Sequence, residues 1–257
     1  MNIRPPPLVC YRMDTSSSVF LTAQWRYLLM ANYEVPPGIL QPHVPPGTEL
    51  DFRDGKTYAS IVGFRFLDTR LLGIPVPLHQ NFTEVNLRFY VRYQSPEGWK
   101  RGTVFISEIV PKPAIVWVAN SLYREHYSYA PMRYSIEQDK DHLQVVYRWK
   151  KGGWNSIRAF AQNQLVTMRE GSMEEFIAEH YWGYAALDEH KTNEYGVEHP
   201  PWQYYPVTRF EAEYNVSHLY GAGFEPYLNQ PPASVFVAHG SEVVVRKAQS
   251  FTTLAIA

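Results

Sequence analysis

The middle of the chain alternates between apolar and polar residues, which is typical of a strand with two different faces. In residues 81–93, Glu84, Asn86 and Arg88 point to one side of the predicted strand, and the apolar residues between them point to the other. Other segments rich in β-branched and aromatic residues also predict strands. These predicted strands cover residues 57–67, 104–110, 114–123, 143–150, 156–162, 207–214 and 233–248.

Two segments before the first predicted strand show the signals of a helix. Residues 19–35 carry apolar side chains at helical spacing and follow Ser18, which can cap a first turn. Pro37 is well suited to the first turn of a helix. A short helix is therefore predicted around Gly38–Gln41.

One further helix interrupts the run of strands. Ser172 and Glu175 have the spacing of a capping box near the start of residues 171–184. Apolar side chains then recur along one side of the predicted helix. They are Met173, Phe176, Ile177, Tyr181 and Tyr184.

The order of these elements predicts the fold class. About eight to ten strands outnumber two or three helices and do not alternate with them, which favours a largely antiparallel sheet curled into a barrel or sandwich, with helices outside it. The class is therefore α+β, mostly β. No repeat, low-complexity tract or long linker divides the chain, so residues 1–257 are expected to form one domain.

Composition and charge remove several classes of function. The net charge is −1 and no cluster of Lys and Arg is visible, so no nucleic-acid partner is expected. Cys10 is the single cysteine, which rules out an internal disulfide and a Cys-rich zinc site. The N-terminal segment lacks the apolar core of a signal peptide, and no run of about 18 apolar residues occurs. A cytoplasmic protein without a membrane partner is the simplest interpretation.

Known catalytic motifs are absent from the sequence. The nine histidines are scattered without metal-ligand spacing, so no metal site is expected. The chain contains no GxSxG motif, P-loop or GxGxxG motif, and no cofactor is expected. The segment VEHPPWQ, residues 197–203, is interpreted as a rigid loop that packs Trp202 rather than as a site.

The polar face of residues 81–93 is the strongest local signal for chemistry. On the outer face of a sheet, Glu84, Asn86 and Arg88 would form a solvated stripe of little energetic value. On an inner face they would place a carboxyl group beside a guanidinium group, as ligand sites often do. Alternation alone leaves both interpretations open.

Several longer stretches carry a family resemblance that runs in order along nearly the whole chain. They are WRYL with VPPGILQPHVPPG, DGKTYASIVGF, FTEVNLRFYV, SLYREHYSYAPMRY, SMEEFIAEHYWGY, VEHPPWQ and PPASVF. The sequence resembles the DUF2071 family of bacterial YqjF-like proteins, which is in turn similar to acetoacetate decarboxylase. The resemblance implies a cone-shaped antiparallel β-barrel with an internal cavity. It also favours an inward orientation of Glu84.

Two motifs carry the likeness to the decarboxylase. Residues 82–84 match an aromatic-Thr-Glu segment whose Glu works in the cavity, and residues 124–132 lie over the segment that holds the decarboxylase's two lysines. In this chain the lysine positions are Pro131 and Met132, and Ala130 replaces a proline. Neither Pro131 nor Met132 can form the imine on which that reaction depends. Schiff-base decarboxylation at this position is therefore excluded.

These observations give a set of candidate site residues and three alternatives for function. Glu84 is the candidate catalytic residue, and the candidate ligand-binding residues are Arg26, Asn86, Arg88, Arg124, His126, Tyr129 and Met132. The first alternative is a protein that binds a small anionic or carbonyl-containing molecule. The second is an enzyme that uses Glu84 for acid–base chemistry on such a molecule. The third is a structural or interaction protein, and the aromatic content is compatible with a homo-oligomer.

Overall fold

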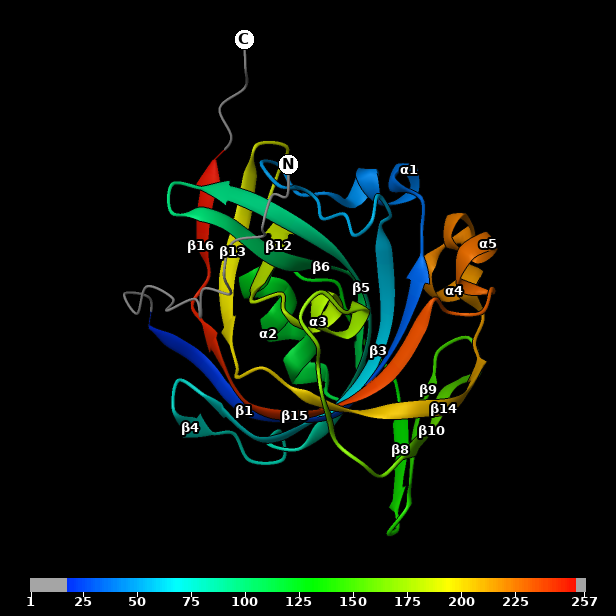
Figure 1. The fold of residues 1–257 in the computed structure, drawn as a ribbon. Helices are drawn as coiled ribbons and strands as arrows, with labels where there is room; N and C mark the ends of the chain where they lie inside the picture. Colours follow the sequence, from blue (N-terminus) through cyan, green and yellow to red (C-terminus); the bar gives the residue numbers. More distant parts are fainter. Residues whose placement is uncertain (1–17, 253–257) are drawn as a thin grey trace.

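Strands make up most of the structure and form one continuous hydrogen-bonded network (Figure 1). The computed structural model describes residues 18–252, so Cys10 and the N-terminal segment discussed above lie outside the described residues. The strands are β1 (Val19–Glu34), β2 (Glu49–Leu50), β3 (Tyr58–Leu71), β4 (Ile74–Pro75), β5 (Phe82–Ser95), β6 (Gly98–Val110), β7 (Tyr127–Tyr129), β8 (Met132–Gln138), β9 (His142–Lys150), β10 (Trp154–Gln162), β11 (Val166–Thr167), β12 (Trp182–Ala186), β13 (Lys191–Glu198), β14 (Gln203–Glu213), β15 (Ser234–Arg246) and β16 (Gln249–Thr252). The helices are α1 (Pro37–Leu40), η1 (Gln41–His43), α2 (Pro113–Tyr123), α3 (Met173–Ala178), α4 (Val216–Tyr220), η2 (Ala222–Phe224) and α5 (Glu225–Leu228).

The longest strands close into a ring. Neighbouring strands follow the order β13, β12, β6, β5, β3, β1 and β15, and β15 pairs back onto β13 at Val197 and Glu198. The pairs in this ring are antiparallel except for β12 with β6. The expected mostly-β class with a curled sheet is confirmed. The helices were expected outside the sheet; α4 and α5 lie there, but α2 and α3 appear within the curve of these strands (Figure 1).

A second layer covers part of the outside of the ring. The strands β14, β10, β9 and β8 continue from β15 as an extension of the sheet. Tyr147 and Ile157 from this extension lie so close to Gly63 of β3 that a Cβ atom at Gly63 would stand 2.6 Å from the Tyr147 ring. Residues Val85 and Leu87 of β5 belong to the same buried cluster. The apolar face of β5 therefore packs against the extension in a hydrophobic core outside the ring. The polar face of β5 points to the inside of the ring.

The predicted helix at residues 19–35 is wrong, because this segment forms strand β1. β1 pairs with β3 on one edge and with β15 on the other. Its two faces are both buried, with Leu29 in one hydrophobic cluster and Leu28 in the other. A strand that is apolar on both faces has no clear alternation, so its apolar positions also match helical spacing.

The predicted strand at residues 114–123 is also wrong, because this segment forms helix α2. Pro113 occupies the first turn of the helix, where its missing N–H costs nothing. The side of α2 that carries Ile115 and Ala119 lines the cavity described below, and Trp117 on another side is 72% exposed. Its β-branched and aromatic residues are frequent in strands, and this composition misled the prediction.

The other predicted elements agree with the structure, with some changes in extent. Ser172 caps α3, since its Oγ accepts from the backbone N–H of Glu175 at 3.1 Å. This helix ends at Ala178 rather than near residue 184, and the chain enters β12 at Trp182. The short helix expected around Gly38–Gln41 is present as α1 and η1. Among residues 18–252, no helix is long and apolar enough to span a membrane.

Candidate functional site

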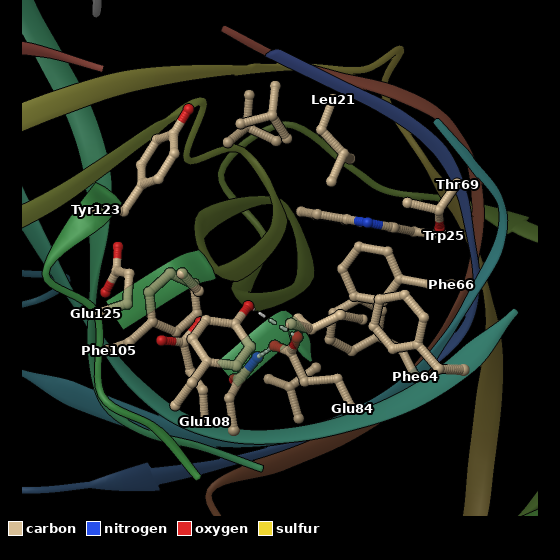
Figure 2. Close-up of a pocket in the computed structure, with 18 of the residues that line it drawn as sticks. Leu21, Trp25, Phe64, Phe66, Thr69, Glu84, Phe105, Glu108, Tyr123 and Glu125 are labelled. Carbon is tan, nitrogen blue, oxygen red and sulfur yellow. Dashed lines mark hydrogen bonds between the residues drawn. The ribbon is translucent and has the colours of Figure 1, made fainter. Parts of the chain in front are cut away.

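A cavity of about 250 Å³ lies on the inner side of the ring (Figure 2). The pairing of β5 with β3 builds its floor, because Phe64 lies opposite Glu84 and Val62 lies opposite Asn86. Residues two apart on a strand share a face, so Glu84, Asn86 and Arg88 all reach this cavity. The polar stripe found in the sequence is therefore turned inward, as the family resemblance implied.

One half of the cavity wall is aromatic. Trp25 packs edge-on against Phe64 and Phe66, with ring centres 5.2 and 5.6 Å apart, and Phe66 stacks on Phe82. In Figure 2, Trp25, Phe64 and Phe66 lie on the opposite side of the cavity from Glu108 and Glu125. The site thus has an apolar region and a polar region.

Glu84 is buried in the polar region and holds two hydrogen bonds. The Nδ2 of Asn86 donates to its Oε1 at 2.8 Å, and the hydroxyl of Tyr127 donates to its Oε2 at 3.0 Å. Burial raises the pKa of Glu84 from 4.5 to about 7, although these hydrogen bonds and the nearby charge of Arg88 oppose the rise. Glu84 can therefore exchange a proton near neutral pH.

Two further buried glutamates share the cavity, and the sequence analysis identified neither as a site residue. Glu108 lies on β6 directly across from Asn86, and Glu125 lies just before β7. A bulge in the pairing of β5 with β6 turns both Phe105 and Glu108 inward, although they are three residues apart. Plain alternation places such residues on opposite faces, and no signal in the sequence marks the bulge.

The environment of these two glutamates favours their protonated forms. The hydroxyl of Tyr195 donates to Oε1 of Glu125 at 2.7 Å. Burial is the main cause that raises the pKa of Glu125 to about 8, and Glu84 adds to the rise. The pKa of Glu108 is also raised, first by burial and then by Glu125 and Glu84. Three carboxyl groups in one cavity disfavour one another's charge.

Arg88 is a buried guanidinium group with weak contacts. One of its terminal nitrogens lies 3.5 Å from the carbonyl oxygen of Ile177 and 4.0 Å from the sulfur of Met30. Its carbon Cζ lies 5.8 Å from the ring centre of Tyr90. Within residues 18–252, its Nε has no hydrogen-bond partner. A guanidinium group can donate five hydrogen bonds, so Arg88 retains donors for an incoming acceptor.

His180, which lines the cavity, belongs to a buried Asp–His pair. The Oδ2 of Asp51 lies 3.1 Å from Nε2 of His180 and accepts a hydrogen bond from Nε of Arg101 at 2.6 Å. Burial, with Arg101 next, lowers the pKa of His180 to about 4, so the ring is neutral. Because the Nε2–H of the neutral ring donates to Asp51, the Nδ1 atom carries a lone pair. In the described part of the chain this Nδ1 is buried and has no partner.

The loop at residues 197–203 supplies two more wall residues. Trp202 is buried, as the sequence analysis expected, and its indole N–H donates to Ser241 at 2.9 Å. The ring of His199 stacks on Trp202 with centres 4.0 Å apart, and both residues line the cavity. Burial lowers the pKa of His199 to about 4. The loop therefore packs Trp202 and also borders the site.

The structure places five of the sequence-predicted site residues outside the cavity lining. Arg26 bonds to Gln24 and to the carbonyl oxygen of Gly240. Arg124, in a left-handed conformation at the end of α2, and His126 are exposed, and Tyr129 is 54% exposed. The sulfur of Met132 accepts a hydrogen bond from Thr83. These five residues take no part in the function proposed below.

Lysine is absent from the cavity wall as well as from the decarboxylase-like motif. Among the described residues, no lysine lines the cavity, and Pro131 and Met132 lie outside it. A Schiff-base lysine therefore has no substitute elsewhere in this wall. Within residues 18–252, no group of three or more His, Cys, Asp and Glu side chains has the arrangement of a metal site.

The model of the DUF2071 family, described as an uncharacterized conserved protein, matches residues 22–242. The chain belongs to the DUF2071 family. It is also similar to the uncharacterized protein YqjF of Bacillus subtilis, with 28% identity over 196 residues, which are 75% of this chain and 77% of that protein.

Solved structures with the same fold come from acetoacetate decarboxylase and related enzymes. Acetoacetate decarboxylase of Legionella pneumophila matches with a TM-score of 0.62 and 14% identity, covering 98% of this chain and 94% of that one. An acetoacetate decarboxylase-like enzyme of Sphingomonas wittichii matches with a TM-score of 0.63 and 12% identity, covering 92% and 95%. The enduracididine biosynthesis enzyme MppR, complexed with pyruvate, matches with a TM-score of 0.61 and 10% identity, covering 94% and 93%. The expected acetoacetate decarboxylase-like fold is confirmed, and at these identities the likeness shows the fold alone.

Proposed function

We propose that this protein binds a small molecule with an anionic or carbonyl group inside the cavity of the ring. The observation that carries the proposal is Arg88, a buried guanidinium group whose contacts within the described residues are long or absent. Burying a charged group without good partners is unfavourable, and a ligand oxygen would remove that cost. The aromatic wall around Trp25 and Phe66 would hold the apolar part of the ligand.

The volume of the cavity limits the size of the ligand. Pockets for drug-sized molecules typically measure about 300–1,000 Å³. A cavity of about 250 Å³ lies just below that range and suits a small metabolite. Related folds bind small molecules of this kind, since the structure of MppR contains pyruvate.

A thermal-shift screen tests the proposal. The library contains small keto acids, hydroxy acids, short carboxylates and sugars. A ligand at about a hundred times its dissociation constant stabilises a protein by roughly 2.7 kcal/mol, which is readily measured. The stabilisation should disappear in Arg88→Met and persist in Arg209→Met, a control at an exposed arginine of β14.

Two outcomes oppose the proposal. A stabilising ligand that is indifferent to Arg88→Met would place its site elsewhere. A library without any stabilising ligand would favour the interaction-protein alternative. Arg88→Lys keeps the positive charge and controls for damage to the fold, since it should retain part of the binding.

A second candidate function is an enzyme that performs acid–base chemistry in the same cavity. The observation in its favour is the pKa of Glu84, which burial raises to about 7, the range in which a general acid or base works best at neutral pH. Glu84 would move the proton, and Arg88 would stabilise developing negative charge on the substrate. No imine is involved, because the cavity wall contains no lysine among the described residues.

Glu84→Gln separates the two candidates. The glutamine keeps the size of the side chain but cannot exchange the proton. For an enzyme, turnover of the screened ligand should fall by at least about a hundredfold, while its affinity changes little. If the unmodified protein never converts its ligand, the enzyme candidate is refuted and the binding proposal stands.

A further inference from the structure

Two buried oxygen atoms in the polar half of the cavity lack hydrogen-bond donors. Asn86 and Glu108 face each other across the pairing of β5 with β6, and both line the cavity. The Nδ2 of Asn86 donates a hydrogen bond to Glu84, and the Oδ1 of Asn86 remains free to accept one. In the part of the chain that the structure describes, neither Oδ1 of Asn86 nor Oε2 of Glu108 has a partner. Buried polar atoms are rarely left in this state.

The side chains around these two atoms include more acidic groups than basic ones. Glu84, Glu108 and Glu125 bring three carboxyl groups into one cavity. Among the described lining residues, Arg88 is the one Lys or Arg side chain. The other ionisable groups of the wall are tyrosines and histidines, which come from different elements. They are His79, Tyr123, Tyr127, His180, Tyr195 and His199.

Four of these groups are engaged elsewhere or uncharged, although Tyr127 and the backbone of His126 also bond to the Glu108 carboxyl group. The hydroxyl of Tyr127 donates to Glu84, and the hydroxyl of Tyr195 donates to Glu125. Burial keeps His180 and His199 neutral, since the pKa of each is lowered to about 4. While Glu108 keeps its proton, its own O–H is the donor available to Asn86; once the carboxyl groups ionise, a donor and the balancing positive charge have to come from outside the chain.

We infer that the ligand carries a protonated amine, which donates to Oε2 of Glu108 and Oδ1 of Asn86. This inference rests on the proposed function and specifies it, since the same ligand would place its anionic or carbonyl group on Arg88. An ammonium group donates three hydrogen bonds and satisfies both free acceptors at once. The ligand is then bipolar, with its cationic end at Glu108 and its acceptor end at Arg88.

The geometry of β5 sets the length of such a ligand. Asn86 and Arg88 are two residues apart on one face of the strand, which is a spacing of roughly 7 Å along the backbone. A chain of a few carbon atoms spans this distance. Short amino acids whose amine and carboxylate stand several bonds apart fit this requirement.

Matched probes of one chain length test the inference. Isothermal titration at pH 8 compares 4-aminobutyrate, butyrate and n-butylamine, which differ in the charged groups that they carry. We expect 4-aminobutyrate to bind at least about tenfold more tightly than butyrate, because it adds a charge-assisted hydrogen bond. Its binding should release protons, because an ammonium group favours ionised carboxyl groups, and titration in phosphate and in Tris measures this release.

Glu108→Gln is the decisive variant. It should weaken 4-aminobutyrate about tenfold and reduce the proton release, while leaving butyrate unchanged. Glu137→Gln, at an exposed glutamate of β8, serves as the matched control and should change neither. The affinity for 4-aminobutyrate should also increase from pH 6 to pH 8.5, since the carboxyl groups ionise over that range.

The outcomes separate this inference from the proposed function. If butyrate binds as tightly as 4-aminobutyrate and depends on Arg88, the amine is refuted and the binding cavity stands. If Glu108→Gln leaves the affinity for 4-aminobutyrate unchanged, the assigned position of the amine is refuted. If no probe and no member of the wider screen binds, the proposed function is refuted along with the inference.

Discussion

Replacing Glu84 with glutamine should change the pH dependence of stability in a defined direction. The pKa of Glu84 rises from 4.5 to about 7 on folding, so the folded protein binds a proton that the unfolded chain releases between these values. Stability from this group is therefore complete below pH 4.5 and is lost as the pH rises to about 7. At about 1.4 kcal/mol per pH unit, the full loss is about 3 kcal/mol.

Glutamine removes this loss because it never ionises. At pH 5 the variant should be about as stable as the unmodified protein, since Asn86 and Tyr127 can still bond to the amide. At pH 8 it should be more stable by about 3 kcal/mol, which for a chain of 257 residues corresponds to about 6–12 °C in Tm. Urea unfolding at pH 5, 6, 7 and 8 measures the difference. Equal destabilisation at all four values would refute the buried, protonated state of Glu84.

Two further predictions concern positions that shape the site. Gly240→Ala should lower the free energy of unfolding by about 3 kcal/mol or more, because Gly240 has a φ of +79° and an added Cβ would stand 1.9 Å from the carbonyl oxygen of Trp25. Gly38 has open space around it, so the control Gly38→Ala should change the free energy of unfolding in urea by less than about 0.5 kcal/mol. Asp51→Asn should cost about 3 kcal/mol at pH 7, since it leaves buried His180 without its carboxylate. This cost should shrink on acidification, because the pKa of Asp51 is lowered on folding and its stabilisation is lost as the pH falls; an unchanged cost at pH 3 would contradict this.

The central strand of the site could be predicted from the sequence because its alternation is complete. Glu84, Asn86 and Arg88 share one face of β5, and the structure agrees. Alternation alone did not decide whether that face points inward. The decision depends on the β8–β10 extension, which buries the opposite face of β5 through contacts distant in sequence. The family resemblance supplied this orientation because it implies the whole fold.

Other parts of the site could not be predicted for identifiable physical reasons. Glu108 faces inward because of a bulge, which shifts the face of a strand without a mark in the residue pattern. The sequence of helix α2 resembles that of a strand because it is rich in apolar and β-branched residues, some of which face the cavity. β1 reads as a helix because both of its faces are buried. Each error arises where tertiary burial overrides a local pattern.

A crystal structure of the protein with the best ligand from the screen tests the central claim most directly. The account predicts that the ligand lies inside the ring, with an oxygen atom within hydrogen-bond distance of the Arg88 guanidinium group and its apolar part against Trp25 and Phe66. A ligand bound on the outer surface, with the cavity left empty, would contradict the account.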